Sequence, residues 1–109
     1  MQRISLEALA RQQLEAASRS SVGRAADTVY GGHEKVLRQT VIALTAGSTL
    51  AEHENPGEAT LHVLHGRVRL TAGDHAWEGR DGDLIIVPDA RHAVEALEDS
   101  TFVLTVAKK

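Results

Sequence analysis

The chain begins with an apolar stripe at helical spacing, in which small and aliphatic residues recur every three or four positions: Leu6, Leu9, Ala10, Leu14 and Ala17. This spacing predicts a helix over residues 5–17, with Ser5 as its N-cap. Because the stripe is narrow and rich in alanine, we expect a terminal helix that covers one end of the domain or packs on a dimer partner. A stretch rich in Ser, Gly and Arg, residues 17–24, then predicts a linker.

After Gly31 and Gly32 the pattern changes to short apolar runs rich in β-branched residues. We predict strands at residues 35–44, 59–65, 67–71, 75–78, 83–87, 92–97 and 101–107, with a short extended piece at 50–53. Gly, Asn, Asp, Pro and Ser cluster between these runs, as is typical of tight turns. Many short strands without helices between them indicate an antiparallel sandwich or barrel.

Composition limits the classes of function. With 109 residues the chain is long enough for one domain and its core, and its formal charge of -3 gives no general attraction to nucleic acid or to an anionic membrane. Only 3% of the residues are aromatic, which disfavours a surface for stacking bases, so a nucleic-acid partner is not expected. The absence of cysteine excludes disulfides, thiolate metal sites and cysteine nucleophiles.

Targeting signals are not evident in the sequence. Charged residues interrupt the first 21 positions, and no run approaches the roughly 18 apolar residues of a membrane span. We therefore expect a cytoplasmic protein without a membrane partner.

Two segments combine glycine and histidine: GSTLAEHENPGEATLHVLHG over residues 47–66 and GDLIIVPDARH over residues 82–92. They resemble the two motifs of the cupin superfamily. The first family motif reads Gly, five residues, His-x-His, three or four residues, Glu, six residues, Gly. In GSTLAEHENPGEATLHVLHG, Gly47, His53 and Gly66 keep this spacing, whereas Asn55 replaces the second His and Ala59 replaces the Glu. The glycine frame is present, and two of the three ligand positions are changed.

The second motif of the family reads Gly, five residues, Pro-x-Gly, two residues, His. Here Gly82 and Pro88 keep their places, Ala90 replaces the Gly, and His92 comes one residue early. The resemblance covers roughly residues 28–107. It implies an all-β, antiparallel jelly-roll (cupin) barrel of about eight strands, preceded by a short N-terminal α-helix. The implied organisation is a helix and linker over 1–24 and a barrel domain over 25–109, in a homodimer.

The resemblance also implies a pocket for a small-molecule ligand inside the barrel. Its predicted lining is His53, Asn55, Leu61, Val63 and His92. In the full family motif, three imidazoles and a carboxylate suit Fe, Mn, Ni or Zn. In this chain His53 and His92 remain as an incomplete metal site, which the Asn55 carbonyl oxygen and water could complete. The alternative is that both histidines line a metal-free pocket, where an imidazole can titrate near neutral pH.

Strand alternation predicts which neighbours can join this site. Residues of equal parity share one face, so Leu61 and Val63 accompany position 59, whereas Glu58 and His62 point away from it. Glu58 could join the site only if the turn after Pro56 and Gly57 distorted this alternation. Arg38 stands alone in an apolar run and could pair with a carboxylate ligand if it pointed inward. An arginine on the sheet surface is the commoner outcome and is the prediction here.

The remaining polar and aromatic residues have ordinary interpretations. Trp77 is predicted to pack on the sheet, and the acidic loop residues to be solvated because they lack the spacing of a calcium loop. The other histidines are expected at the surface or beside turns: His33, His62, His65 and His75.

Three functions follow from these patterns. The first is a binding module that holds a small molecule in a barrel without a complete metal site. The second is a metal-dependent isomerase or oxygenase that uses His53 and His92, and the third is a regulatory or stress-associated protein that acts through its surface. The changed residues Asn55 and Ala59 favour the first or the third. Whether the protein is an enzyme, and which residue would be catalytic, stays open at this stage.

Overall fold

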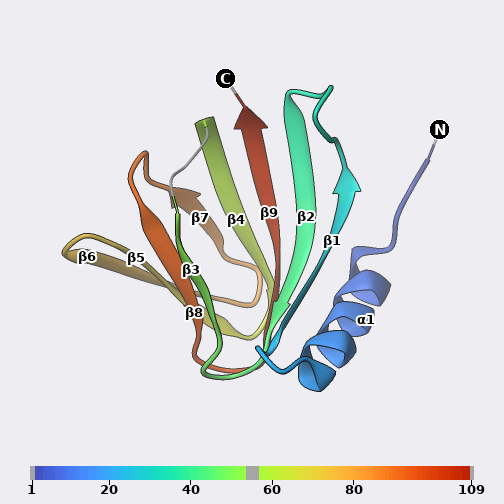
Figure 1. Ribbon diagram of the computed structural model, residues 1–109, viewed down its shortest axis with the longest axis horizontal. Helices are drawn as coiled ribbons and strands as arrows, with labels where there is room; N and C mark the ends of the chain where they lie inside the picture. Colours follow the sequence, from blue (N-terminus) through green and yellow to red (C-terminus); the bar gives the residue numbers. More distant parts are fainter. Residues whose placement is uncertain (1, 54–56, 109) are drawn as a thin grey trace.

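Two antiparallel β-sheets pack face to face in a computed structural model that describes residues 2–53 and 57–108 (Figure 1). The five-stranded sheet has the order β1 (Arg24–Tyr30), β2 (Leu37–Leu44), β9 (Ser100–Lys108), β4 (Gly57–His65), β7 (Leu84–Val87). The four-stranded sheet has the order β3 (Thr49–His53), β8 (His92–Ala96), β5 (Arg67–Ala72), β6 (His75–Arg80). The predicted all-β jelly roll with an N-terminal helix is confirmed.

Helix α1 (Leu6–Arg19) lies outside the five-stranded sheet, beside β1 and β2 (Figure 1). Ser5 is its N-cap, and the Ser5 hydroxyl accepts a hydrogen bond from the Ala8 amide at 3.2 Å. Ala10 and Ala17 of the predicted stripe are both buried against the chain's own sheet, because their small side chains allow the helix to pack closely on it. The helix therefore covers the outer face of the sheet within a single copy of the chain.

Strand β1 is the one strand that the sequence pattern did not predict. Most of its side chains are exposed, so it lacks the apolar alternation by which a half-buried strand is recognised. Pairing with β2, from Arg24 opposite Leu44 to Thr28 opposite Thr40, holds it in place. The predicted linker over 17–24 is also corrected, because α1 continues through Arg19 and β1 begins at Arg24.

The core fills the space between the two sheets. Phe102 of β9 lies opposite Ile42 on one side and Val63 on the other, and all three are buried. Strand β2 is buried on both faces, since Ile42 and Leu44 join this core whereas Val41 and Ala43 are buried on the opposite face, the one that α1 covers. This explains why the run VIAL is continuously apolar rather than alternating.

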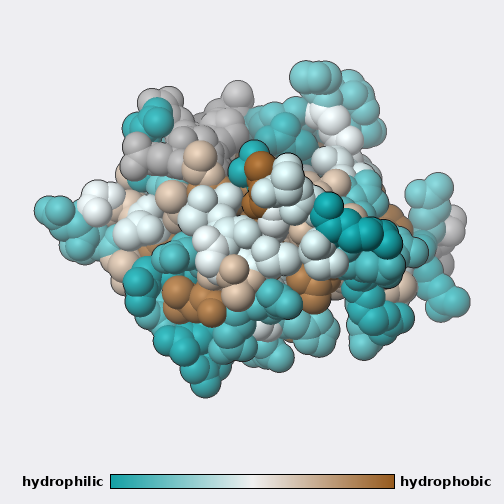
Figure 2. All heavy atoms as spheres, turned by 60° about the horizontal axis from the view of Figure 1, so that its bottom comes forward, coloured by the Kyte–Doolittle hydropathy of each residue, from teal (hydrophilic) through white to brown (hydrophobic). Residues whose placement is uncertain are grey.

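The end of the sandwich that carries the turns after β4 and β6 is tied together by hydrogen bonds. The Gly66 amide donates to a carboxylate oxygen of Asp81 at 2.6 Å, and the Arg80 amide donates to Asp83 at 2.9 Å. Figure 2 brings this lower end of the molecule forward, and on that face hydrophobic residues form small separate patches among hydrophilic ones.

Candidate functional site

His92 is the first residue of β8 and the most informative residue of the predicted site. It is only 3% exposed, and strand alternation places it on the same face as Val94 and Ala96, which belong to the core. The structure thus positions His92 on the inward face, at the upper end of the sandwich in Figure 1. A buried imidazole at a strand terminus is a group that can serve as ligand anchor, base or metal ligand.

The turn before β8 orients this imidazole. His92 Nδ1 lies 2.9 Å from the carbonyl oxygen of Ala90, and the Ala90 amide in turn donates to the Pro88 carbonyl at 2.9 Å. Because a carbonyl oxygen only accepts, this hydrogen bond requires the proton on Nδ1. In the neutral imidazole Nε2 then carries the lone pair, an arrangement that also orients metal-ligating histidines.

A β-bulge brings the second predicted histidine opposite the first. Strand β3 pairs with β8 so that Leu50 lies opposite Val94, but the register then shifts by one residue and His53 becomes the partner of His92. Without the shift Glu52 would occupy that position, and bulges commonly re-aim a residue next to a site in this way. The two histidine backbones are therefore neighbours, while Asn55 and the side chain of His53 lie outside the described residues.

Strand β4 follows the predicted alternation. Leu61 and Val63 are 1% and 0% exposed and belong to the core together with Ala59, whereas Glu58 and His62 are exposed. Glu58 therefore does not supply the carboxylate that the family motif has at the position of Ala59. Leu61 and Val63 lie on the inward face, and their role in lining a ligand pocket stays a prediction.

Arg38 is the functional candidate that sequence reasoning placed on the wrong face. The pairing of β2 with β9 is regular from Leu37 to Leu44, so Arg38 shares the inward face with Ile42 and Leu44 of the core. Arg38 is partly buried and lies opposite Val106. In the sequence, Arg38 lies an even number of positions from Ile42 and from Leu44, which indicates the same strand face. The prediction followed the general preference of arginine for protein surfaces instead.

Five inward residues make up what we name the His92 end: Arg38 of β2, Val106 of β9, Ala59 of β4, Val87 of β7 and His92 of β8. Register joins the first four across neighbouring strands. The short loop 88–91 then carries the chain from the end of β7 to His92 in the other sheet. The His92 end thus combines an imidazole, a guanidinium and small apolar side chains.

The possible metal ligands at the His92 end fit only an incomplete metal site. In the part of the chain that the structure describes, no three His, Asp or Glu side chains gather in a way that could hold a metal ion. His92 offers an Nε2 of suitable tautomer, but the motif position for a carboxylate is occupied by Ala59, which is apolar. A divalent cation held by imidazoles and neutral oxygen alone would lack the anionic ligand that raises affinity.

The other histidines and acidic residues lie where they were expected. His33, His62 and His75 are exposed, and His65 lies at the surface with Nδ1 3.8 Å from Asp81. The acidic loop residues Asp81 and Asp83 accept backbone hydrogen bonds in turns.

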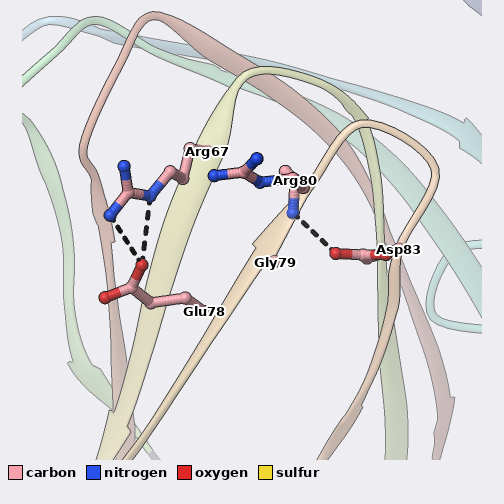
Figure 3. A pocket seen from close by; sticks show the side chains of 5 residues that line it. All are labelled: Arg67, Glu78, Gly79, Arg80 and Asp83. Carbon is pink, nitrogen blue, oxygen red and sulfur yellow. Dashed lines mark hydrogen bonds and ion pairs between the residues drawn. The ribbon is translucent and has the colours of Figure 1, made fainter.

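A pocket of about 100 Å³ lies beside β5, β6 and the turn between β6 and β7 (Figure 3). Its lining residues include Arg67, Glu78 and Arg80. Glu78 accepts hydrogen bonds from Arg67 and Arg69 at 2.9 Å, and these bonds, the one from Arg69 first, hold the pKa of the Glu78 carboxyl below its usual range. Asp83 also lines the pocket, so its two arginines face two carboxylates, which argues against an anion site here.

Comparison with known families agrees with the geometry. The family model described as "Cupin domain" matches residues 40–108, which is more than half of the chain. The chain belongs to the cupin family. No curated protein shows significant similarity to this cupin.

Solved structures share the fold of this cupin. A conserved protein of unknown function from Streptococcus pyogenes superposes with a TM-score of 0.74 at 25% identity, over 83% of this chain and 78% of that one. A cupin superfamily protein from Desulfitobacterium hafniense gives 0.72 at 15% identity, over 79% and 78%. A variant of the salicylate 1,2-dioxygenase from Pseudoaminobacter salicylatoxidans, in complex with gentisate, gives 0.78 at 16% identity, over 92% of this chain but only 32% of the dioxygenase.

Among the described residues, α1 is too short and too polar to cross a membrane.

Proposed function

We propose that this cupin binds a small organic molecule at the His92 end, without a complete metal site. The observation that carries the proposal is the buried, inward His92, whose imidazole is oriented by Ala90 and whose strand partner is His53. We further propose that His53 and Asn55 contribute polar contacts, with Leu61 and Val63 as the apolar floor. The gentisate bound by the dioxygenase that shares this fold is a small organic ligand of the same kind.

NMR spectroscopy tests the binding site. Saturable changes in the His92 imidazole and β8 amide resonances on addition of small organic compounds are the expected result, because the ligand would contact the inward face of β8. The His92→Ala variant should lose this binding, whereas His62→Ala should retain it since His62 is exposed on the opposite face of β4. Resonance changes confined to the outer surface of either sheet would contradict the proposal.

A metal-dependent isomerase or oxygenase is the second candidate, because the chain keeps His53 and His92 at motif positions that bind a divalent cation such as Zn, Fe, Mn or Ni in the full motif. Such a cation would supply Lewis-acid or oxygen chemistry beside the ligand. Ala59 at the carboxylate position counts against this candidate.

Metal content decides between the two functions. After reconstitution with each of these four metals, we expect the purified protein to retain less than stoichiometric amounts, because Ala59 stands at the carboxylate position of the motif. The assay is elemental analysis of the wild type and of His53→Ala, His92→Ala and His62→Ala. One bound metal per chain in the wild type and in His62→Ala, lost in the other two variants, would establish the metal enzyme instead.

We also propose a homodimer that covers the outward face of β7. This strand is an edge of the five-stranded sheet, and its outward side chains Leu84 and Ile86 are 59% and 70% exposed. They lie beside Trp77, which is 43% exposed on the edge strand β6, around a surface pocket of about 340 Å³. A second copy would protect both the apolar side chains and the unpaired backbone of this edge.

Sedimentation velocity at micromolar concentration checks the dimer. The wild type is expected to sediment as a dimer and Ile86→Glu as a monomer, because a charge would have to be buried in the interface. Val36→Glu is the matched control, since Val36 is 67% exposed and lies away from β7. A monomeric wild type, or equal behaviour of the two variants, would contradict this interface.

A further inference from the structure

Arg38 places a positive charge on the inward face of the sandwich. Its position follows from backbone register: Arg38 lies opposite Val106, and Val106 lies opposite Ala59. These three residues form one row across β2, β9 and β4, at the same end as His92. Because alternate residues of a strand share a face, the core positions of Ile42 and Leu44 fix the direction of Arg38.

Among residues 2–51 and 57–108, whose side chains the structure describes, no carboxylate forms an ion pair with Arg38. The ion pairs described there use other arginines: Arg11, Arg19, Arg67 and Arg69. A second cation at this end, Lys108, donates to the Gly32 carbonyl, which is neutral. A partly buried guanidinium among apolar side chains is unfavourable unless an anion pairs with it.

Side-chain size changes along the inward face. In the middle of the sandwich the gap of roughly 10 Å between packed sheets is filled by large side chains such as Phe102, Leu61 and Leu70. In the row of Arg38 the apolar side chains are smaller, namely Ala59, Val87 and Val106. The row of Arg38 therefore contributes less apolar side-chain volume than the middle of the sandwich does.

We propose that the ligand of the His92 end is a small organic carboxylate, bound through its carboxylate group by the guanidinium of Arg38. The proposal rests on the proposed binding function and specifies its ligand class. The guanidinium of Arg38 supplies a single positive charge, which matches a monoanion, and guanidinium binds carboxylate through two parallel hydrogen bonds. The apolar body of the ligand packs against Ala59, Val87 and Val106, and His92 contacts its polar substituents.

A matched ligand series tests this class. The probes are butyrate, benzoate and salicylate, each paired with its neutral amide, titrated into the wild-type protein and followed by the backbone amide resonances of β2, β8 and β9. We expect carboxylates to bind at least about tenfold more tightly than their amides, since the charge-assisted hydrogen bonds are lost in the amide. Arg38→Gln should abolish this difference. Arg11→Gln removes the same charge from the exposed face of α1 and should leave it unchanged.

The outcomes separate the two proposals. Equal binding of carboxylates and amides at β8, or full carboxylate binding by Arg38→Gln, would overturn the role of Arg38 and leave the binding function standing. No saturable change at β8 with any of the six probes would overturn the carboxylate class, while binding of other compounds at His92 would still support the proposed function. If Arg38→Gln unfolds, Arg38→Lys provides the second comparison, because it keeps the charge and loses the paired geometry, so tight carboxylate binding should weaken.

Discussion

Replacement of Phe102 by alanine is expected to lower the free energy of unfolding by about 3–5 kcal/mol. Phe102 is fully buried in the middle strand of the five-stranded sheet, opposite Ile42 and Val63. It is the one phenylalanine in the chain, and the core otherwise depends on aliphatic side chains. Truncation would remove its apolar contacts and leave a cavity that strands fixed by backbone pairing cannot close.

Urea unfolding followed by circular dichroism measures this loss. Phe102→Leu is the control, because it keeps an aliphatic side chain in the same place and should lose at most about half as much. A domain of this size has a total stability of about 5–15 kcal/mol, so Phe102→Ala should be markedly easier to unfold. A loss below about 1 kcal/mol would show that the sheets are packed differently around β9.

Substitution of Gly66 by alanine is expected to be similarly damaging, with a loss of about 3 kcal/mol or more. Gly66 has φ +99°, a conformation that residues with a side chain rarely adopt. An added Cβ would also come within 2.7 Å of the Ser100 Cα and would collide with the Asp99 carbonyl. Both neighbours are backbone atoms at the start of β9, so relief would require movement of the central strand.

Gly82→Ala is the matched control for this substitution. Gly82 also has a positive φ, +86°, but an added Cβ there meets no atom within 4 Å. Gly82→Ala should therefore lower the free energy of unfolding only by the cost of the positive φ, about 1–2 kcal/mol. Thermal unfolding of the two variants separates conformational strain from collision, and equal losses would mean that the collision at Gly66 is relieved without cost.

The glycine frame of the two cupin motifs now has a physical basis. Gly47, Gly66 and Gly82 all adopt positive φ, between +86° and +99°, where the chain turns between strands. Only at Gly66 does a neighbouring strand also exclude a side chain. The glycine spacing of the motifs therefore follows from the positions of the turns. It identifies the fold whether or not the metal-ligand residues of the motifs are present.

Local patterns predicted most of the elements, because their causes are local. The cap at Ser5, the alternation along β4 and the turns between strands involve residues close together in the sequence. The same alternation correctly placed Leu61 and Val63 on the inward face and His62 on the outward face. Strand β1 was missed because its stability comes from pairing with β2, which no pattern within residues 24–30 reveals.

The candidate site shows most clearly which features follow from the sequence and which follow only from the tertiary structure. By itself the sequence determined a cupin jelly roll, the pair His53 and His92, and the loss of the carboxylate at Ala59. Only the tertiary structure decided that a bulge sets His53 opposite His92 and that Arg38 faces inward with His92 at one end of the sandwich. Both facts depend on the register between strands far apart in the chain, and register is set by the burial of whole faces rather than by any single segment.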